Sequence, residues 1–471
     1  MTEFNFDNEQ EDQMNVLELV EQYEQASKSG YLSYFDEEAY ETIIEYYENK
    51  GQFEYALDVS VKSLIQYPYS SILLLKKAQV HFELKQIQLS LEILEKAELY
   101  DSSEVGIYTL RAEIFAFQSQ YAEAVTLLKK IIKTADKEDL PDIYLQLCDV
   151  YEEWEKYDEV YECLILCLKI DGLNEEALNR LNYCVEITNK NEQTIPFFKQ
   201  LIDQHPYSEF AWYGLACCYA RADKYEQAVN AYEYVSAINE DADFVYQDIA
   251  ELHYKQGEYR KALDVIKDMC DIFEADDEIY FLQGKCHEAL GDMKMARYCY
   301  RKAVHSNPSF SEAHFRIGET YKQEGLWEQA FKSFQKANDL EKEQYEFCIA
   351  MAEAAMEMAE ADVVINACET AIDISMNRYE AYFLLAKIIS IGGDTDTALQ
   401  ILIKGTDVCK ATIPLNYAIC AIAFMENKPK QGEVLLRMLL NEDYDTHYKL
   451  FEFCEPLEDD IFVLQIIAEY N

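Results

Sequence analysis

Histidine is the side chain in this sequence that is best suited to metal binding, and three of its histidines share one register. The chain repeats a 34-residue frame, and His81, His253 and His287 occupy the eleventh position of that frame. The last two belong to consecutive repeats, with Cys286 beside His287. A metal site needs three or four converging ligands, which the sequence does not supply at any one place. We therefore interpret these histidines as replacements for the tyrosine usual at this position, and a metal-dependent enzyme around His253 and His287 is the least favoured hypothesis.

The fourteen cysteines indicate packing rather than a disulfide framework. Several stand within predicted helices in place of other small apolar residues, which is typical of reduced core cysteines. These are Cys163, Cys167, Cys184, Cys217, Cys286 and Cys368. No phosphate-binding, nucleophile-elbow or zinc-protease motif accompanies them. The sequence thus predicts no enzyme activity, no metal and no cofactor.

A strict period identifies the elements that carry these residues. With one two-residue slip between the third and fourth repeats, in Thr134 to Leu140, the repeats begin at Glu37, Ser71, Val105, Pro141, Glu175, Glu209, Asp243, Asp277, Ser311, Tyr345, Tyr379 and Ile413. Alanine recurs at the twentieth position: Ala56, Ala124, Ala228, Ala262, Ala296, Ala330 and Ala398. Repeats of about 20 to 50 residues stack into arrays, because one unit cannot bury its apolar face alone. Function is therefore expected on an extended surface.

Each repeat predicts two helices joined by a turn. Trp212, Leu215 and Tyr219 mark the apolar face of a first helix, helix A, and Tyr225 and Ala228 begin that of a second, helix B. In five repeats glycine stands at the fifteenth position, where a helix that ends in left-handed geometry needs a residue without a β-carbon. These glycines are Gly51, Gly257, Gly291, Gly325 and Gly393.

The pattern W-x2-L-G-x2-Y, followed by A, F and P in a 34-residue frame, resembles the tetratricopeptide repeat. The resemblance covers about residues 37 to 446 and identifies the chain as similar to a bacterial-type scaffold made of these repeats throughout. It implies an all-α solenoid of about twelve helix-turn-helix repeats, coiled into a right-handed superhelix. Residues 1–36 are expected to form an acidic segment and a capping helix, with the first fourteen residues loose. Residues 447–471 are expected to form C-terminal capping helices.

Both ends of an array need covers for their apolar faces. The N-terminal cap is predicted to use Val16, Leu19, Val20 and Tyr23. The closing helix is predicted to bury Leu457, Ile461, Leu464 and Ile467 on one side.

Charge narrows the range of partners. The net charge is −48, from 41 basic and 89 acidic residues, so binding to nucleic acid or anionic lipid is disfavoured and basic partners are favoured. The alternative is that the acids only solvate the convex helix faces. Residues 1–10 lack the features of a secretory signal, and no run approaches the ~20 apolar residues of a membrane span. A cytoplasmic protein without membrane insertion is expected.

The resemblance implies that helix A lines a concave groove, into which positions 2, 5, 6, 9, 12 and 13 of each repeat point. Aromatic anchors among acids at such positions suit an extended basic or amphipathic peptide. The candidate peptide-binding groove consists of Phe210, Tyr213, Phe244, Glu251, Tyr254, Phe281, Lys285, Phe315, Glu319, Glu353 and Phe383. The alternative is that about half of the aromatic side chains pack against a neighbouring helix A instead.

The resemblance raises one specific binding mode, the clamp for the tails of chaperones. In that clamp, lysine stands at the fifth and asparagine at the ninth position of one helix A. Those positions here hold, for example, Phe281 with Lys285 and Phe315 with Glu319, so chaperone docking is not expected. The favoured prediction is a non-catalytic scaffold that holds one or more protein partners. The alternative is a structural subunit that self-assembles, for instance as a homodimer.

Overall fold

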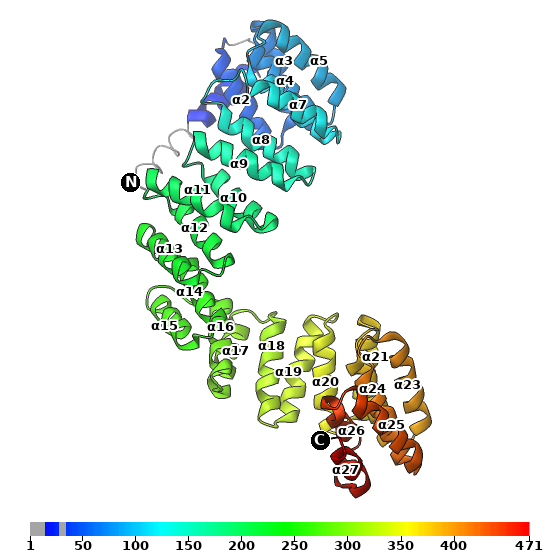
Figure 1. Cartoon of the computed structure of the whole chain (residues 1–471). Coiled ribbons are helices and arrows are strands. Elements are labelled where there is room, and N and C mark those ends of the chain that lie inside the picture. Colours follow the sequence, from blue (N-terminus) through cyan, green and yellow to red (C-terminus); the bar gives the residue numbers. More distant parts are fainter. Residues whose placement is uncertain (1–14, 28–33, 471) are drawn as a thin grey trace. The chain divides into compact units, whose positions relative to one another are not determined.

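The computed structural model describes residues 15–27 and 34–470. These residues form helices joined by turns and contain no β-strand, which confirms the predicted all-α solenoid of stacked helix pairs (Figure 1). The chain divides into two compact units, Met1–Asp241 and Ala242–Asn471. The first fourteen residues, predicted to be loose, lie outside the described residues. None of the described helices is both long and apolar enough to cross a membrane.

Unit 1 consists of a helix over residues 15–27 followed by helix pairs. The A helices are α2 (Glu37–Asn49), α4 (Ser71–Glu83), α6 (Val105–Phe117), α8 (Leu140–Glu153), α10 (Glu175–Thr188) and α12 (Glu209–Arg221). The B helices are α3 (Phe53–Gln66), α5 (Ile87–Tyr100), α7 (Tyr121–Ile131), α9 (Tyr157–Ile170), α11 (Asn191–Gln204) and α13 (Tyr225–Ile238).

Unit 2 continues the pairs and ends in a cap. Its A helices are α14 (Asp243–Lys255), α16 (Asp277–Ala289), α18 (Ser311–Gln323), α20 (Tyr345–Glu357), α22 (Tyr379–Ile391) and α24 (Ile413–Met425). Its B helices are α15 (Tyr259–Cys270), α17 (Met293–Ser306), α19 (Trp327–Leu340), α21 (Ala361–Ile374), α23 (Thr395–Val408) and α25 (Pro429–Glu442). The cap comprises η1 (Asp445–His447), α26 (Tyr448–Phe453), η2 (Glu455–Asp459) and α27 (Ile461–Ala468).

Small residues allow the two helices of a pair to approach closely. All seven alanines at the twentieth position are completely buried. Gly318 on α18 lies against Phe334 on α19, and a β-carbon at Gly318 would fall well inside van der Waals contact of that ring. The helices therefore meet at a separation that the smallest side chains determine.

The turn between helices A and B has the same left-handed backbone in every repeat. The five glycines at the fifteenth position have φ between 68° and 91°. Where glycine is absent, another residue takes that conformation with φ between 53° and 60°: Lys85, Ser119, Glu155, Asn189, Asp223, Ala359 and Asn427. The fold thus imposes this backbone conformation whether or not glycine is present, and in seven repeats a residue with a β-carbon adopts it at the cost of strain.

Exchanging residues at this turn is expected to change stability in opposite directions. Ala359→Gly should raise the free energy of unfolding by about 0.5–1 kcal/mol, because it removes the left-handed strain, which exceeds the entropy that glycine adds to the unfolded chain. Gly325→Ala should lower that free energy by about 1 kcal/mol. Hydrogen exchange of the amides in the two repeats measures both changes locally, and a destabilised Ala359→Gly variant would contradict this view of the turn.

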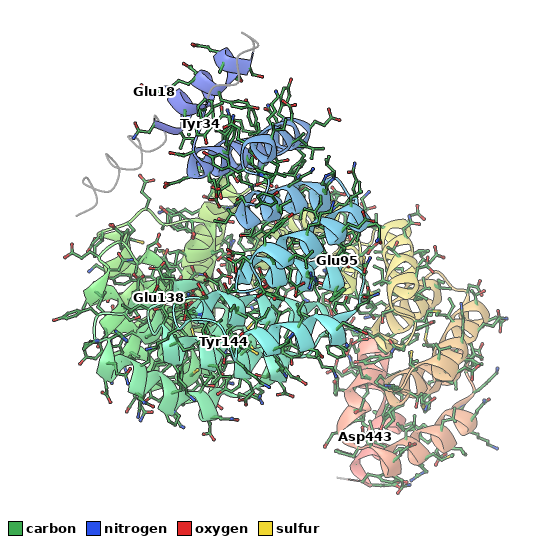
Figure 2. All side chains as sticks on the ribbon, turned by 90° about the horizontal axis from the view of Figure 1, so that it is seen from above. Glu18, Tyr34, Glu95, Glu138, Tyr144 and Asp443 are labelled. Atoms are coloured by element: carbon green, nitrogen blue, oxygen red, sulfur yellow. The ribbon has the colours of Figure 1, made fainter. Side chains whose placement is uncertain are left out.

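The connection between the third and fourth repeats holds the two-residue slip. Helix α7 ends at Ile131 and α8 begins at Leu140, so the intervening loop spans residues 132–139. Glu138 in this loop and Tyr144 on α8 are labelled in Figure 2. Both helices belong to unit 1, so this loop interrupts the packing of one unit and does not separate the two units.

The structure buries the residues predicted for the N-terminal cap, but at the C-terminal end it buries a different set from the predicted one. Val20 and Tyr23 are buried in the first core cluster, with Val16 and Leu19 packed against it. At the other end, Ile461 is 72% exposed and Leu464 is 43% exposed, whereas Val463, Ile466 and Ile467 are buried with Leu457. The predicted apolar side was wrong because η2 breaks the helical phase. Helix α27 restarts at Ile461, where the Asp460 carboxylate accepts hydrogen bonds from the N–H groups of Phe462 and Val463.

Candidate functional site

The candidate groove residues lie on A helices, and all but one of them are accessible. Phe210 and Tyr213 are on α12 of unit 1, and the others are on A helices of unit 2. Phe244 is exposed, and the remaining accessible residues are partly buried. The exception is Phe383 on α22, which is 2% exposed.

Phe383 does not belong to an open surface. Its ring lies 5.4 Å from that of Phe453 on α26, and the Lys449 ammonium lies 5.4 Å from its ring centroid. The cap therefore covers this position of the eleventh repeat. The repeat frame alone places Phe383 in the groove, because α26 lies outside the repeat.

The aromatic side chains at the fifth position join neighbouring elements. Phe281 lies 5.4 Å from Tyr300 on its own helix B and 4.7 Å from Phe310, which precedes the next helix A. Phe315 repeats the arrangement, 5.5 Å from Phe334 and 4.9 Å from Phe347. Both rings bridge consecutive repeats, as the packing alternative expects. Their substitution would disturb packing, so they are poor probes of partner binding.

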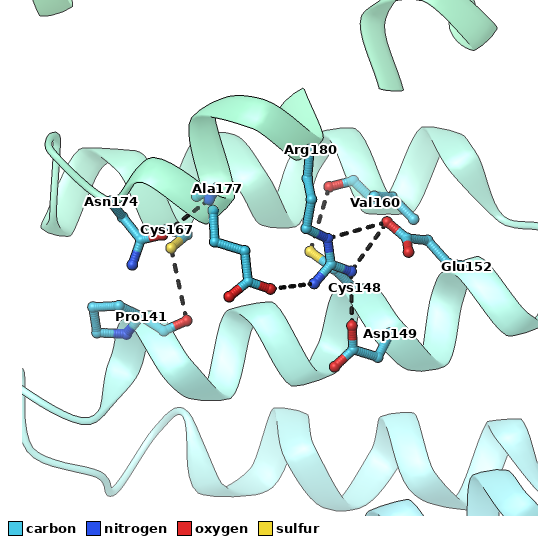
Figure 3. A network of polar contacts seen from close by, with 10 residues as sticks. Pro141, Cys148, Asp149, Glu152, Val160, Cys167, Asn174, Ala177 and Arg180 are labelled. Carbon is cyan, nitrogen blue, oxygen red and sulfur yellow. Dashed lines mark hydrogen bonds and ion pairs between the residues drawn. The ribbon is translucent and has the colours of Figure 1, made fainter. Parts of the chain in front are cut away.

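Ion pairs between repeats occupy other positions on the same face. Arg180, at the sixth position of its repeat, lies 2.8 Å from Asp149 and 3.0 Å from Glu152, both on the preceding helix A. It also pairs at 3.1 Å with Glu176 on its own helix. In Figure 3, dashed lines join the guanidinium of Arg180 to Asp149 and Glu152. One guanidinium with several donors thus joins three carboxylates across two repeats.

The same arrangement recurs along the array. Lys76 pairs with Glu45 and, at 3.7 Å, with Glu41 of the preceding repeat. Arg316 lies 3.8 Å from Glu288 of the preceding repeat and 2.9 Å from Glu312. The cation stands at the sixth position in each case, and these are the three of the twelve repeats that have a basic residue there.

Two of the candidate acids share one lysine. The Lys322 ammonium lies 2.6 Å from Glu353 and 3.7 Å from Glu319. Burial raises the pKa of the Glu319 carboxyl, Lys322 opposes that shift, and Glu353 adds to it. In unit 2 these two acids are therefore largely balanced within the protein.

In unit 1 a group of four carboxylates has only one such pair, which Asp149 forms with Arg180. The acid strip consists of Glu83 on α4, Glu113 on α6, and Asp149 and Glu153 on α8, all with exposed side chains. Within the described residues, Glu83, Glu113 and Glu153 form no ion pair. The pKa of Glu113 is raised, first by partial burial of its carboxyl and then by Glu83, Asp149 and Glu153. The nearby carboxylates thus repel one another across three consecutive A helices.

A neighbouring position shows the same shortage of cations. Glu48 on α2 has a pKa raised to about 7, chiefly by burial, and the opposing effect of Lys76 does not cancel it. Its Oε1 atom is buried and has no hydrogen-bond partner among the described residues. Part of this face of unit 1 therefore holds carboxyl groups that a cation would stabilise.

The histidines contribute to turns between helices. His81 Nδ1 lies 2.7 Å from Gln86 Oε1, and His253 Nδ1 lies 2.9 Å from Glu258 Oε2. In both repeats the contact joins the eleventh position of helix A to the residue just before helix B. Among the residues that the structure describes, no three histidine, cysteine, aspartate or glutamate side chains converge as metal ligands. The fourteen cysteines are unpaired thiols, most of them buried.

Comparison with known proteins identifies the repeat in both units. Residues 277–310 and 311–344 match one tetratricopeptide repeat model, and residues 210–236 match a second. No curated protein matches the chain.

Solved structures provide further likenesses of low identity. One is YrrB, a tetratricopeptide repeat protein with an unusual peptide-binding site, at 17% identity over 39% of this chain and 95% of that one, with a TM-score of 0.33. The Cut9–Hcn1 hetero-tetramer of the APC/C is similar at 14% identity over 79% and 86%, with a TM-score of 0.36. The C-terminal part of a tetratricopeptide repeat-containing protein from Cytophaga hutchinsonii is similar at 15% identity over 53% and 97%, with a TM-score of 0.42.

Proposed function

Because the chain is a tetratricopeptide repeat protein, we propose that it is a non-catalytic scaffold whose A helices bind an extended, basic segment of a protein partner. The acid strip of unit 1 is the observation that carries this proposal. Its carboxylates lie on consecutive A helices, and three of the four, those of Glu83, Glu113 and Glu153, form no ion pair within the described residues. A partner that supplies lysine or arginine side chains would relieve their mutual repulsion and gain charge-assisted hydrogen bonds.

The distance between neighbouring A helices indicates how the basic residues of such a segment would be spaced. Helices α4, α6 and α8 are neighbours, and packed helices lie about 8–10 Å apart. An extended chain advances about 3.3 Å per residue, so a basic residue at every third position would meet one repeat after another. The partly buried ring of Phe210, on α12 of the same unit, would supply an apolar contact beyond the strip, whereas Tyr213 at the fifth position packs 5.8 Å from Tyr232.

Self-association is the second candidate function, and the C-terminal cap supports it. Helix α27 exposes Ile461, Phe462 and Leu464, a larger apolar face than a closed end of an array requires. The net charge of −48 opposes association, although salt screens that repulsion beyond about 8 Å. Sedimentation across a dilution series separates the two functions, because a monomer at all concentrations excludes a homodimer.

A reducing compartment such as the cytoplasm suits this function. Thirteen of the fourteen cysteines are at least partly buried, and all of them are unpaired. Free thiols in this number are typical of proteins that are not exposed to oxidising conditions.

The acid strip can be tested by comparing two variants of equal charge. Glu83→Gln/Glu113→Gln/Glu153→Gln removes three carboxylates from the strip. Glu92→Gln/Glu95→Gln/Glu123→Gln removes three exposed carboxylates from the B helices α5 and α7. In affinity capture from native lysate with quantitative mass spectrometry, the strip variant should lose most of the basic partners that the wild type retains at 150 mM salt. The control variant should keep them, whereas equal retention by both variants would exclude the strip as the binding site.

A further inference from the structure

A second surface, on the opposite side of the helix pairs from the acid strip, has a shape and charge that the proposed function does not use. In unit 1, an open cleft of about 650 Å³ lies between the B helices α7 and α9. Its floor is formed by Tyr144, Leu147 and Tyr151 on α8. These residues occupy the fourth, seventh and eleventh positions of their repeat, which face away from the acid strip.

The same positions form a smaller cleft two repeats later. There Trp212, Leu215 and Tyr219 make the floor between α11 and α13, and the volume is about 360 Å³. Tyr234 stacks on Trp212 at 4.2 Å and fills part of that space. The residue equivalent to Tyr234 is Leu166, which is 40% exposed at the side of the larger cleft. A smaller side chain therefore leaves the floor of the larger cleft open.

The irregular connection between the third and fourth repeats contributes to this opening. Helix α7 has 11 residues, whereas α9, α11 and α13 have 14. The chain leaves α7 early and reaches α8 through residues 132–139, so Ile132 and Lys133 border the cleft. The two-residue slip thus borders the larger of these two clefts.

The two walls of the cleft carry opposite charges. Lys129 and Lys133 come from the α7 side, and Asp158, Glu159 and Glu162 come from α9. Lys190 pairs with Asp158 at 2.7 Å and so neutralises only part of the acidic wall. Within the described residues, Lys129, Lys133, Glu159 and Glu162 form no ion pair. The cleft is therefore an apolar floor between one basic and one acidic wall.

We propose that this cleft binds an amphipathic helix of a protein partner, whose apolar stripe is flanked by carboxylates on one side and by basic side chains on the other. The apolar floor would receive the stripe, as in other helix-in-groove complexes. The carboxylates would face Lys129 and Lys133, and the basic side chains would face Glu159 and Glu162. A helix that matches the 11 residues of α7 would be about 16 Å long, or three turns.

The proposal differs from the proposed function in the recognised conformation and in the pattern of charge. An extended basic segment would satisfy the acid strip, whereas a uniformly basic helix would meet Lys129 and Lys133 with like charge. Such juxtaposition acts against wrong partners, in addition to the attraction that selects the right one.

Three synthetic helical peptides with the same leucine stripe provide the test. One has glutamate on one flank and lysine on the other, the second has glutamate on both flanks, and the third has lysine on both. Fluorescence anisotropy with the full chain at 150 mM salt should show that the split-flank peptide binds at least about tenfold more tightly than either of the others. Tightest binding by the all-lysine peptide would reflect attraction to the net charge alone and would overturn the proposal, as would three equal affinities or no binding.

Charge reversal of the basic wall tests the same assignment on the protein. Lys129→Glu/Lys133→Glu should make the all-lysine peptide the tightest ligand. Lys130→Glu/Lys137→Glu makes the same change in net charge at exposed residues that do not line the cleft, and it should leave the ranking unchanged. An unchanged ranking in the first variant would contradict the proposal. A dimeric wild type that becomes monomeric in the first variant would also overturn it, because the occupant would then be a second copy.

The acid-strip variant separates this proposal from the proposed function. Glu83→Gln/Glu113→Gln/Glu153→Gln should bind the split-flank peptide with unchanged affinity, because none of the three residues lines the cleft. If that variant loses the peptide, the peptide binds the acid strip and the cleft assignment fails.

Discussion

Replacing Ala228 by glutamate is expected to unfold the sixth repeat and to lower the free energy of unfolding by about 3–5 kcal/mol. Ala228 has no exposed surface and lies on α13, at a position where the helices α12 and α13 approach each other closely. A carboxylate there would be buried without a cation among apolar side chains. Each repeat is stabilised by its neighbours, so the loss should spread to adjacent repeats and fade with distance.

Hydrogen exchange followed by mass spectrometry measures this effect locally, because stacked repeats do not unfold as a single unit. Amides of α12 and α13 should lose protection first, while those of α4 and α5 should keep it. Gln227→Glu adds the same charge at the adjacent, exposed residue and serves as the control. If Ala228→Glu melts like the wild type, the repeat register described here is wrong.

Gly318→Ala should lower the free energy of unfolding by about 1–3 kcal/mol, the usual cost of adding volume to a packed core. The added methyl group would overlap the ring of Phe334, which is completely buried. In two other repeats alanine replaces this glycine and leucine replaces this phenylalanine. These pairs are Ala78 with Leu94 and Ala386 with Leu402. In these repeats a β-carbon at the eighth position is accompanied by a side chain smaller than phenylalanine at the twenty-fourth.

A double-mutant cycle checks this complementarity. Phe334→Leu alone should cost about 1–2 kcal/mol because it leaves a cavity. In Gly318→Ala/Phe334→Leu the methyl group fills part of that cavity, so the double variant should be more stable than the sum of the single effects predicts. The sixth repeat keeps both a β-carbon and a ring at these positions, since Ala216 and Tyr232 are both buried there, so we expect the cost of Gly318→Ala to stay within the range given. Strictly additive costs would show that the two side chains do not determine the helix separation.

Much of the fold can be predicted from the sequence because every repeat must stack on the next. The small residues and the turns therefore recur at fixed positions of the 34-residue frame. The first residues of eleven A helices coincide with the starts of the 34-residue frame, and α8 begins one residue early, at Leu140. The left-handed turn is visible in the sequence only where glycine marks it. At Lys85 or Ala359 the same backbone is imposed by the packed helices on either side.

The candidate site was less predictable, because its balance depends on contacts between repeats. The positions of the acidic residues in the repeat frame do not reveal that Arg180 forms ion pairs with Asp149 and Glu152, which lie about 30 residues earlier in the chain. The basic residues at the sixth position of three repeats, Lys76, Arg180 and Arg316, were the signal that could have revealed these pairs. Phe383 was misplaced for a different reason, since α26 folds back over it from outside the repeat frame. The acid strip becomes distinct only after the paired acids are identified.

Photo-cross-linking tests most directly whether a partner lies along the A helices of unit 1. Phe117 is 54% exposed on α6, one turn beyond Glu113, so its replacement by p-benzoylphenylalanine keeps the aromatic ring and directs the added benzoyl group to solvent. Leu99 on α5 is 84% exposed and provides the control position on a B helix. We predict that the probe at residue 117 cross-links to a basic segment of a captured protein, that the probe at residue 99 does not, and that Glu113→Gln weakens the product. Cross-links from residue 99 alone would contradict the proposed binding surface.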